Sequence, residues 1–512
     1  MKEYSSKEWI TQKQTKNKVP RLLSIPATTD VHTYLFDQNM SDGLPMVPPT
    51  LERFKWMLTG TDLPPSTVLG KMPPILATCT VANVAINSIL AGCQPCHLTI
   101  VIAAVRAMLD PAFNLHGVHA TTMGATPMLI INGSNRIAQA SHLNFKHGAL
   151  GSGQNNRANA TIGRAVKLVL QNCGRAQLGG TESTTIGGPR KFTMALCENH
   201  EALHQGPWLP FRGGGTDCVT VHAVSSGLDQ LTDTKATRSI FIRLMAQKIA
   251  NLWAPNMPIK LSECVVIICP EHYKMLHESG ISSKQQLADL LYHQSNALCQ
   301  NSLPFVVRTA LINQAGPITE NICAGLGYVL SSISWVLQKL ASPVTARSPL
   351  NTCTWAVVAI LTMRRLGRRG ILFVASLLAL GKTGLLKKFV LGLNALTSKM
   401  DNASSIHIVV SGSHAGKFSA VVPGFGCALK TSMVLSSCVT RPIPPSPSTM
   451  AKDAAAMLGQ VVSAGSKGAG AARMQICDPR GQCEMPRTLQ AKRTGAPPKV
   501  LGLMDISKPG NT

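Results

Sequence analysis

Short apolar runs alternate with stretches of helical periodicity over most of this chain. The apolar runs lie at residues 128–131, 265–268 and 406–410, and the helical patterns lie at 50–58, 80–91, 96–109, 158–170, 271–276 and 283–294. Runs of this length fit strands that are buried on both faces, and strands that alternate with helices are typical of sheets covered by helices. The sequence therefore predicts an α/β or α+β fold, with a mixed sheet core and flanking helices.

The composition of the 512 residues fits a globular chain with 45% apolar residues, 14% charged residues and a mean hydropathy of +0.13. Disorder throughout is excluded, because disordered chains are poor in apolar residues. The chain contains 15 cysteines, but its first residues carry no apolar stretch of the kind found in secretory signals. We therefore expect a reducing, cytoplasmic setting.

The net charge is +25, and residues 303–400 contribute 11 basic residues against 1 acidic residue. Nucleic-acid binding usually combines a basic face with aromatic base readers, and aromatic residues make up only 4% of this chain. We do not expect a nucleic-acid partner.

Changes in composition divide the chain into segments. The expected order is a polar N-terminal segment (1–40), a main α/β domain (41–324), a basic and apolar insertion (325–400), a continuation of the main domain (401–440) and a Pro- and Ala/Gly-rich linker (441–473). Within the insertion, the apolar blocks 355–361 and 371–380 are shorter than the ~20 residues that a membrane-spanning helix needs. The alternatives for this stretch are a membrane-surface helix over 355–393 and a sequence that comes from an intron or a shifted reading frame.

Cys93 and Cys96 form a Cys-x-x-Cys pair beside a predicted helix. A helix N-terminus lowers the pKa of a nearby thiol and makes it a nucleophile, so Cys93 is a candidate catalytic thiol. The alternative is a pair of small buried thiols at a helix junction.

The segment 114–124 places His116 and His119 next to the hydroxyls of Thr121 and Thr122. The two imidazoles could transfer protons, and the threonines could bind substrate. Two histidines could also ligate a metal, but neither a carboxylate nor a cysteine lies in the same loop, so we predict no metal site.

Four further positions complete the predicted site. Arg157 and Asn159 lie where a glycine-rich loop leads into a helix, and Lys417 lies in a glycine-punctuated loop after a strand. Both basic residues could hold an anionic group, and the alternative at 151–161 is an Asn-capped helix after a flexible loop. Glu198 is a candidate proton carrier, with a solvated loop as the alternative. We expect these loops to meet at one cleft that holds a negatively charged substrate.

Residues 42–302, and again residues 406–426, resemble the large component of the UGSC-type system, a family named for a selenocysteine-Gly-Ser-Cys or Cys-Gly-Ser-Cys motif on a small partner domain. The similarity rests on residues 42–50, 91–93, 109–117, 120–122, 156–164, 198–199 and 406–426. Residues 474–512 resemble the start of the small domain, which would be truncated before its Cys-Gly-Ser-Cys loop. Cys93 matches the family pattern, whereas Cys96 does not.

The resemblance implies a thiol- or selenol-linked redox enzyme subunit that acts on a small anionic substrate, in secondary metabolism. The alternative is a non-catalytic binding or assembly protein that presents substrate to a separate Cys-Gly-Ser-Cys partner. The expected partners are therefore a small molecule and a UGSC-domain protein, with no membrane. The sequence leaves the cofactor, the oligomeric state and the choice between enzyme and binding protein open.

Overall fold

A computed structural model describes a large part of the chain. The described residues are 21–26, 28–133, 135–211, 217–225, 227–232, 237–252, 263–300, 402–425, 439–444 and 473–480. The predicted insertion at 325–400, most of the predicted linker at 441–473 and the end of the chain after residue 480 lie outside them.

The core consists of two four-stranded mixed sheets, and their strands include the three runs predicted from the sequence. The first sheet has the order β11-β6-β4-β5, built from β4 (Thr126–Asn132), β5 (Ala195–Cys197), β6 (Cys218–Val224) and β11 (Val439–Pro442). The second has the order β7-β10-β8-β9, built from β7 (Asp229–Thr232), β8 (Cys264–Ile268), β9 (Ile406–Val410) and β10 (Phe418–Pro423).

The two sheets share one arrangement of strand directions. In each, a parallel pair (β4 with β5, and β8 with β9) is extended by two antiparallel strands. An isolated bridge between Val224 and Gly424 links the end of β6 to the residue after β10. The two sheets therefore adjoin at this point.

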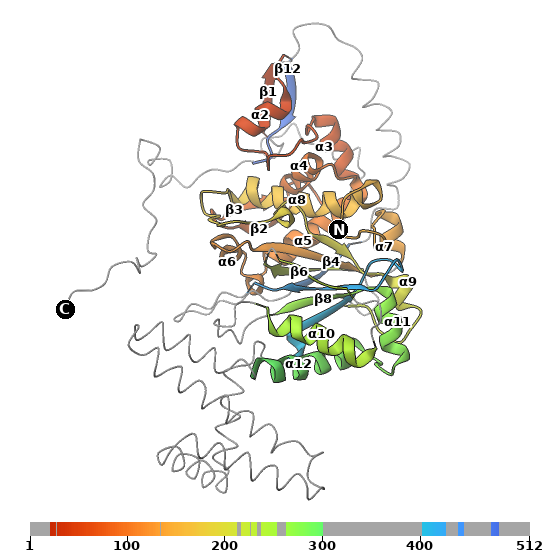
Figure 1. Cartoon of the computed structure of the whole chain (residues 1–512). Helices are drawn as coiled ribbons and strands as arrows, with labels where there is room; N and C mark the ends of the chain where they lie inside the picture. The colour runs from red at the N-terminus through yellow and green to blue at the C-terminus, as the bar shows by residue number, and fades with distance from the viewer. Residues whose placement is uncertain are drawn as a thin grey trace, which may run out of the picture.

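Alternation along the strands divides the molecule into four layers. Leu129 and Ile131 of β4 pack with the helices on one side, whereas Met128 and Ile130 belong to a separate apolar cluster that also contains Val409 of β9. Because successive strand residues point to opposite faces, this second cluster is the layer between the two sheets. Figure 1 shows α4, α5 and α8 outside one sheet, and α10 and α12 outside the other.

The helices confirm the predicted periodic segments. One outer layer contains α3 (Leu51–Leu58), α4 (Val81–Ala91), α5 (Pro95–Met108) and α8 (Arg157–Gly174), and the other contains α10 (Arg238–Ala250), α11 (Pro270–Glu278) and α12 (Lys284–Gln300). Thr80 caps α4 in a capping box with Asn83, and Gly92 ends that helix with φ 89°. Just before α12, the Ser283 hydroxyl accepts a hydrogen bond from the Gln286 amide.

The two predicted terminal segments meet at a small two-stranded sheet. β1 (Leu22–Pro26) pairs antiparallel with β12 (Arg473–Cys477), and α2 (Val31–Asp37) follows β1. The predicted polar segment 1–40 contains β1 and α2, and both of these elements bury apolar side chains. Asn87 of α4 donates to the Pro479 carbonyl, so residues 473–480 pack directly on the main domain.

The remaining short elements connect these layers. They are β2 (Val68–Met72), β3 (Ala77–Thr80), α6 (Leu115–His119), α7 (Asn135–Ala140) and α9 (His200–Leu203). Among the described residues, no single helix is long and apolar enough to cross a membrane, and the pair Pro95–Met108 and Pro111–His119 meets that test only jointly, with a bend of 74°.

Candidate metal centre

Two histidines and one glutamate interrupt the apolar layer between the sheets. His222 lies on β6, where Val219, Val221 and Ala223 face the helices and His222 faces the opposite sheet. His407 alternates in the same way with Ile406 and Ile408 on β9. Strand period thus points both imidazoles into the space between the sheets.

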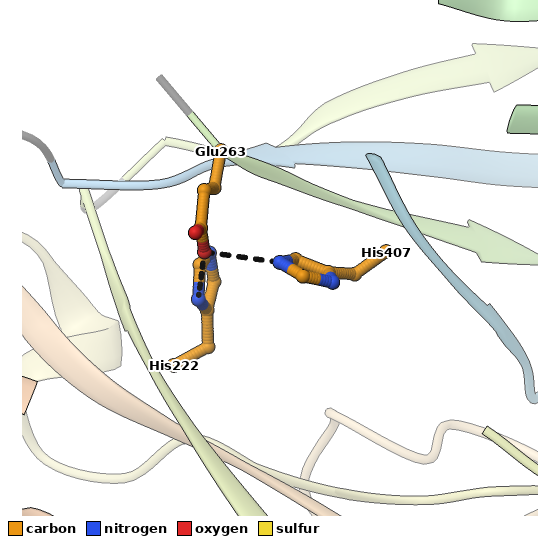
Figure 2. Close-up of side chains that lie close together, drawn as sticks. All are labelled: His222, Glu263 and His407. Carbon is orange, nitrogen blue, oxygen red and sulfur yellow. Dashed lines mark hydrogen bonds and ion pairs between the residues drawn. The ribbon is translucent and has the colours of Figure 1, made fainter. Parts of the chain in front are cut away.

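Glu263 completes the group from the position just before β8. Its Oε2 atom lies 3.0 Å from Nε2 of His407 and 3.4 Å from Nδ1 of His222. The three side chains converge from three separate segments (Figure 2), and their potential ligand atoms all lie within 4.8 Å of one another. The side chain of Glu263 is 26% exposed, whereas those of His222 and His407 are 1% and 5% exposed. The group is therefore reached from solvent through the glutamate.

His222 is held without the hydrogen bonds that a buried imidazole normally makes. Neither of its ring nitrogens has a hydrogen-bond partner among the described residues. Burial, followed by the neighbouring His407, lowers the pKa of His222 to about 3. The ring is therefore neutral, and one of its two nitrogens has a lone pair that could bind a metal ion.

Gly424 lies against this space because the chain passes closely there. A Cβ atom at Gly424 would lie 3.0 Å from Nε2 of His222 and 2.4 Å from the carbonyl oxygen of Glu263. The Gly424 amide donates to that same carbonyl at 2.7 Å. Any larger residue would displace Glu263 or fill the space next to His222.

Two imidazoles and one carboxylate are a donor set suited to a divalent transition-metal ion. Zinc in catalytic sites takes three such protein ligands and leaves a position for water or substrate, and non-haem Fe(II) uses two histidines and one carboxylate. His222, Glu263 and His407 could therefore hold one such ion with open coordination positions.

Glu198 supports this centre from a neighbouring position. It follows β5, and its Oε1 atom lies 2.5 Å from Nζ of Lys284 on α12. Its Oε2 atom accepts a hydrogen bond of 2.7 Å from the Phe211 amide, and the Phe211 ring packs edge-on against His407. The Glu198 side chain is 1% exposed, so the solvated-loop alternative is wrong. Its ion pair also differs from the expected role of a free proton carrier.

The Cys93 thiol does not have the environment expected of a nucleophile. Cys93 is 3% exposed and follows the end of α4. Burial raises the pKa of Cys93 to about 12, and the nearby Arg157 charge offsets only part of this rise. Burial likewise raises the pKa of Cys96 to about 11. The expectation of a lowered pKa is therefore wrong at both positions, and the environment is that of small buried thiols.

The predicted anion-binding residues lie in or beside two loops that both contact residues 144–149. Arg157 donates to the Gly92 carbonyl at 3.4 Å, beside Cys93. Lys417 lies in the β9–β10 loop, where the Gly412 amide donates at 3.0 Å to the Phe145 carbonyl in the loop before α8. Asn159 is buried, and its amide donates to the carbonyls of Asn144 and Ala149, so it fixes the loop before α8.

The predicted loop 114–124 adjoins a different group of charges. His119 is buried at the end of α6, whereas His116 is exposed. The Thr122 carbonyl accepts from the Thr185 amide, and the Thr121 hydroxyl accepts from the Met123 amide. These contacts attach the loop to residues 184–191 rather than to Arg157 or Lys417.

One sequence feature points to the metal ligands. His222 and His407 each stand alone in an otherwise apolar strand, where a buried polar group requires a partner. Glu263 lies 41 residues from His222 and 144 residues from His407 in the sequence, so the pattern does not identify it as their partner. Only the packing of the two sheets brings Glu263 between them.

Fold and site together define a mixed α/β protein with a candidate metal centre between two sheets. No family model matches this chain, and no curated protein or solved structure matches it either.

Proposed function

We propose that this chain is a metal-binding subunit that holds one divalent transition-metal ion on His222, Glu263 and His407. The observation that carries the proposal is the state of His222, a buried imidazole beside a carboxylate, whose two ring nitrogens have no hydrogen-bond partner in the part of the chain that the structure describes. Burying such a group has a free-energy cost unless a ligand satisfies it. A metal ion supplies that partner.

A bound ion of this kind acts as a Lewis acid on a substrate oxygen or lowers the pKa of a bound water. Apolar side chains between the sheets exclude water from the strand side of the group, and the partly exposed side chain of Glu263 connects the group to solvent. A small substrate could approach the group from the side of Glu263. The Phe211 ring against His407, held through Glu198, would keep the ligand orientation fixed.

The resemblance to the UGSC-type large component adds a thiol- or selenol-linked redox setting and a small anionic substrate to this proposal. The raised pKa of Cys93 favours the version in which a separate Cys-Gly-Ser-Cys domain provides the reactive thiol. The second candidate function is accordingly a metal-free protein that only presents substrate to that partner.

Metal stoichiometry tests the first proposal. The purified full chain is treated with chelator, dialysed and titrated with Zn²⁺, and with Co²⁺ to provide a visible absorption spectrum. We expect one ion per chain, and its loss in Glu263→Gln and His407→Gln. His200→Gln is the matched control, since His200 is a buried histidine outside the group and its Nε2 atom has no hydrogen-bond partner among the residues described.

A folded wild-type chain that binds neither ion would contradict the metal proposal. Assays with and without an added Cys-Gly-Ser-Cys domain then separate the two candidate functions. Turnover that needs both the domain and the metal supports the first, and turnover with the metal-stripped chain and the domain supports the second.

A further inference from the structure

A second group of buried charges lies on the other side of the first sheet, away from the metal ligands. We name Lys167, Glu182, Lys191 and His119 the lysine cluster. Lys167 comes from α8, His119 ends α6, and Glu182 and Lys191 lie on the segment between α8 and β5. The side chains of Lys167, Glu182 and Lys191 are only 16%, 7% and 15% exposed.

Lys191 uses its hydrogen-bonding capacity within the protein. Its Nζ atom lies 2.5 Å from Oε1 of Glu182 and donates at 3.0 Å to both the Ala125 carbonyl and the Thr184 hydroxyl. An ammonium group has three donors, so these contacts satisfy it. The Glu182 carboxylate therefore belongs mainly to Lys191.

Lys167 is much less well satisfied. Its only ion-pair contact among the described residues is Oε2 of Glu182, at the longer distance of 3.6 Å. Burial lowers the pKa of Lys167, and Asp42, which also influences it, is already paired through both carboxylate oxygens with Arg164. The cluster thus has two ammonium groups for one available carboxylate.

His119 adds a third polar atom to this excess of donors. It is 2% exposed, and its Nε2 atom has no hydrogen-bond partner in the described part of the chain. Burial and then the charges of Lys167 and Lys191 hold the pKa of His119 well below its ordinary value. The imidazole is therefore neutral and can donate one hydrogen bond to an anion.

We infer that the lysine cluster binds the carboxylate group of a small molecule, with Lys167 as its ion-pair partner and His119 as a hydrogen-bond donor. One missing negative charge matches a carboxylate better than a doubly charged phosphate. The exposed residues Thr122 and Met123 border the cluster through the contact of Met123 with Thr184. This site does not depend on the metal proposal.

Acetate is the probe for the first test, and thermal unfolding of the full chain is the readout. We expect a saturable rise of Tm with sodium acetate that exceeds the rise with sodium chloride at equal ionic strength, because a ligand of the native state stabilises it. Sodium phosphate should give a smaller rise. The His407→Gln variant should respond to acetate as the wild type does, which separates this site from the metal centre.

Two variants distinguish a ligand site from a structural ion pair. Lys167→Met should abolish the acetate response without lowering Tm in chloride, because it removes a poorly paired buried cation. Glu182→Gln should strengthen acetate binding several-fold, because it removes the competing carboxylate. Lys284→Met is the matched control, a buried lysine in a close pair whose loss should lower Tm and leave the acetate response intact.

Two results would overturn the inference. One is a wild-type Tm that rises no more with acetate than with chloride. The other is a Lys167→Met variant that loses as much Tm in chloride as Lys284→Met and still responds to acetate.

Discussion

The ion pair of Glu198 with Lys284 provides the sharpest stability prediction. The carboxylate is 1% exposed, the ammonium group is 14% exposed, and the two lie 2.5 Å apart. Removing one partner leaves the other charge buried, which costs about 3–5 kcal/mol in the free energy of unfolding. Glu198→Leu should fall in the upper part of this range, since it also removes the acceptor of the Phe211 amide. Lys284→Met should fall in the lower part.

The double variant Glu198→Leu/Lys284→Met removes both charges together. We expect it to lose less free energy than the sum of the two single variants by about 2–3 kcal/mol, because neither ion is left alone. Glu198→Gln keeps an acceptor for both partners and should lie between the wild type and Glu198→Leu.

Urea unfolding is the assay, followed by far-UV circular dichroism and tryptophan fluorescence. Equal urea m-values across the set would show that the variants unfold from comparable native states. The exposed pair of Lys274 and Glu278, 3.9 Å apart, is the control, and Lys274→Met should change stability by less than about 0.5 kcal/mol.

A buried ion pair would be contradicted if both single variants at Glu198 and Lys284 lose less than about 1 kcal/mol in the free energy of unfolding, or if the effects of the two substitutions are simply additive. In that case Glu198 would not be held as half of a buried pair. The predicted role of Glu198 as a proton carrier would then regain support.

Three further predictions concern other buried polar positions. Gly424→Ala should weaken Zn²⁺ binding at least several-fold and lower Tm, because its Cβ atom would lie 2.4 Å from the Glu263 carbonyl oxygen. Titration and thermal unfolding measure the two effects. An unchanged Zn²⁺ affinity would argue against the proposed metal centre. Burial lowers the pKa of His97 from 6.5 to about 4, so its contribution to stability is complete above pH 6.5 and is lost as the pH falls toward 4. Between pH 7.5 and pH 5, the free energy of unfolding measured in urea should fall by about 2 kcal/mol less in His97→Asn than in the wild type. An equal fall in both proteins would exclude this assignment. Asn159→Ala should lower the free energy of unfolding by about 1–3 kcal/mol, since it leaves the carbonyls of Asn144 and Ala149 without their donor, whereas a substrate-binding role alone would leave stability unchanged.

Local sequence patterns predict most of the secondary structure. Thr80 followed by an apolar periodic segment and Gly92 specify the start and end of α4, because capping and a left-handed residue depend on neighbours in the sequence. The apolar runs of β4, β8 and β9 likewise predict buried strands without knowledge of the fold. The mixed α/β class follows from their alternation with helices.

The pairing of those strands into two stacked sheets was not predictable in the same way. The sequence does not reveal that β10 lies between β7 and β8, or that β12 pairs with β1 near the other end of the chain. These contacts depend on side-chain packing between segments hundreds of residues apart. The predicted cleft depends on contacts of the same kind, such as the hydrogen bond from the Gly412 amide, in the loop of Lys417, to the Phe145 carbonyl, in the loop before α8.

The sequence by itself determined the chemistry that each local segment could offer: buried strands, capped helices, and solitary histidines in apolar surroundings. Only the tertiary structure decided which side chains share one environment. It placed Cys93 where burial raises the pKa of its thiol, paired Glu198 with Lys284, and brought Glu263 between His222 and His407. The physical reason is that desolvation and Coulomb interactions depend on distance in space, whereas sequence patterns report only distance along the chain.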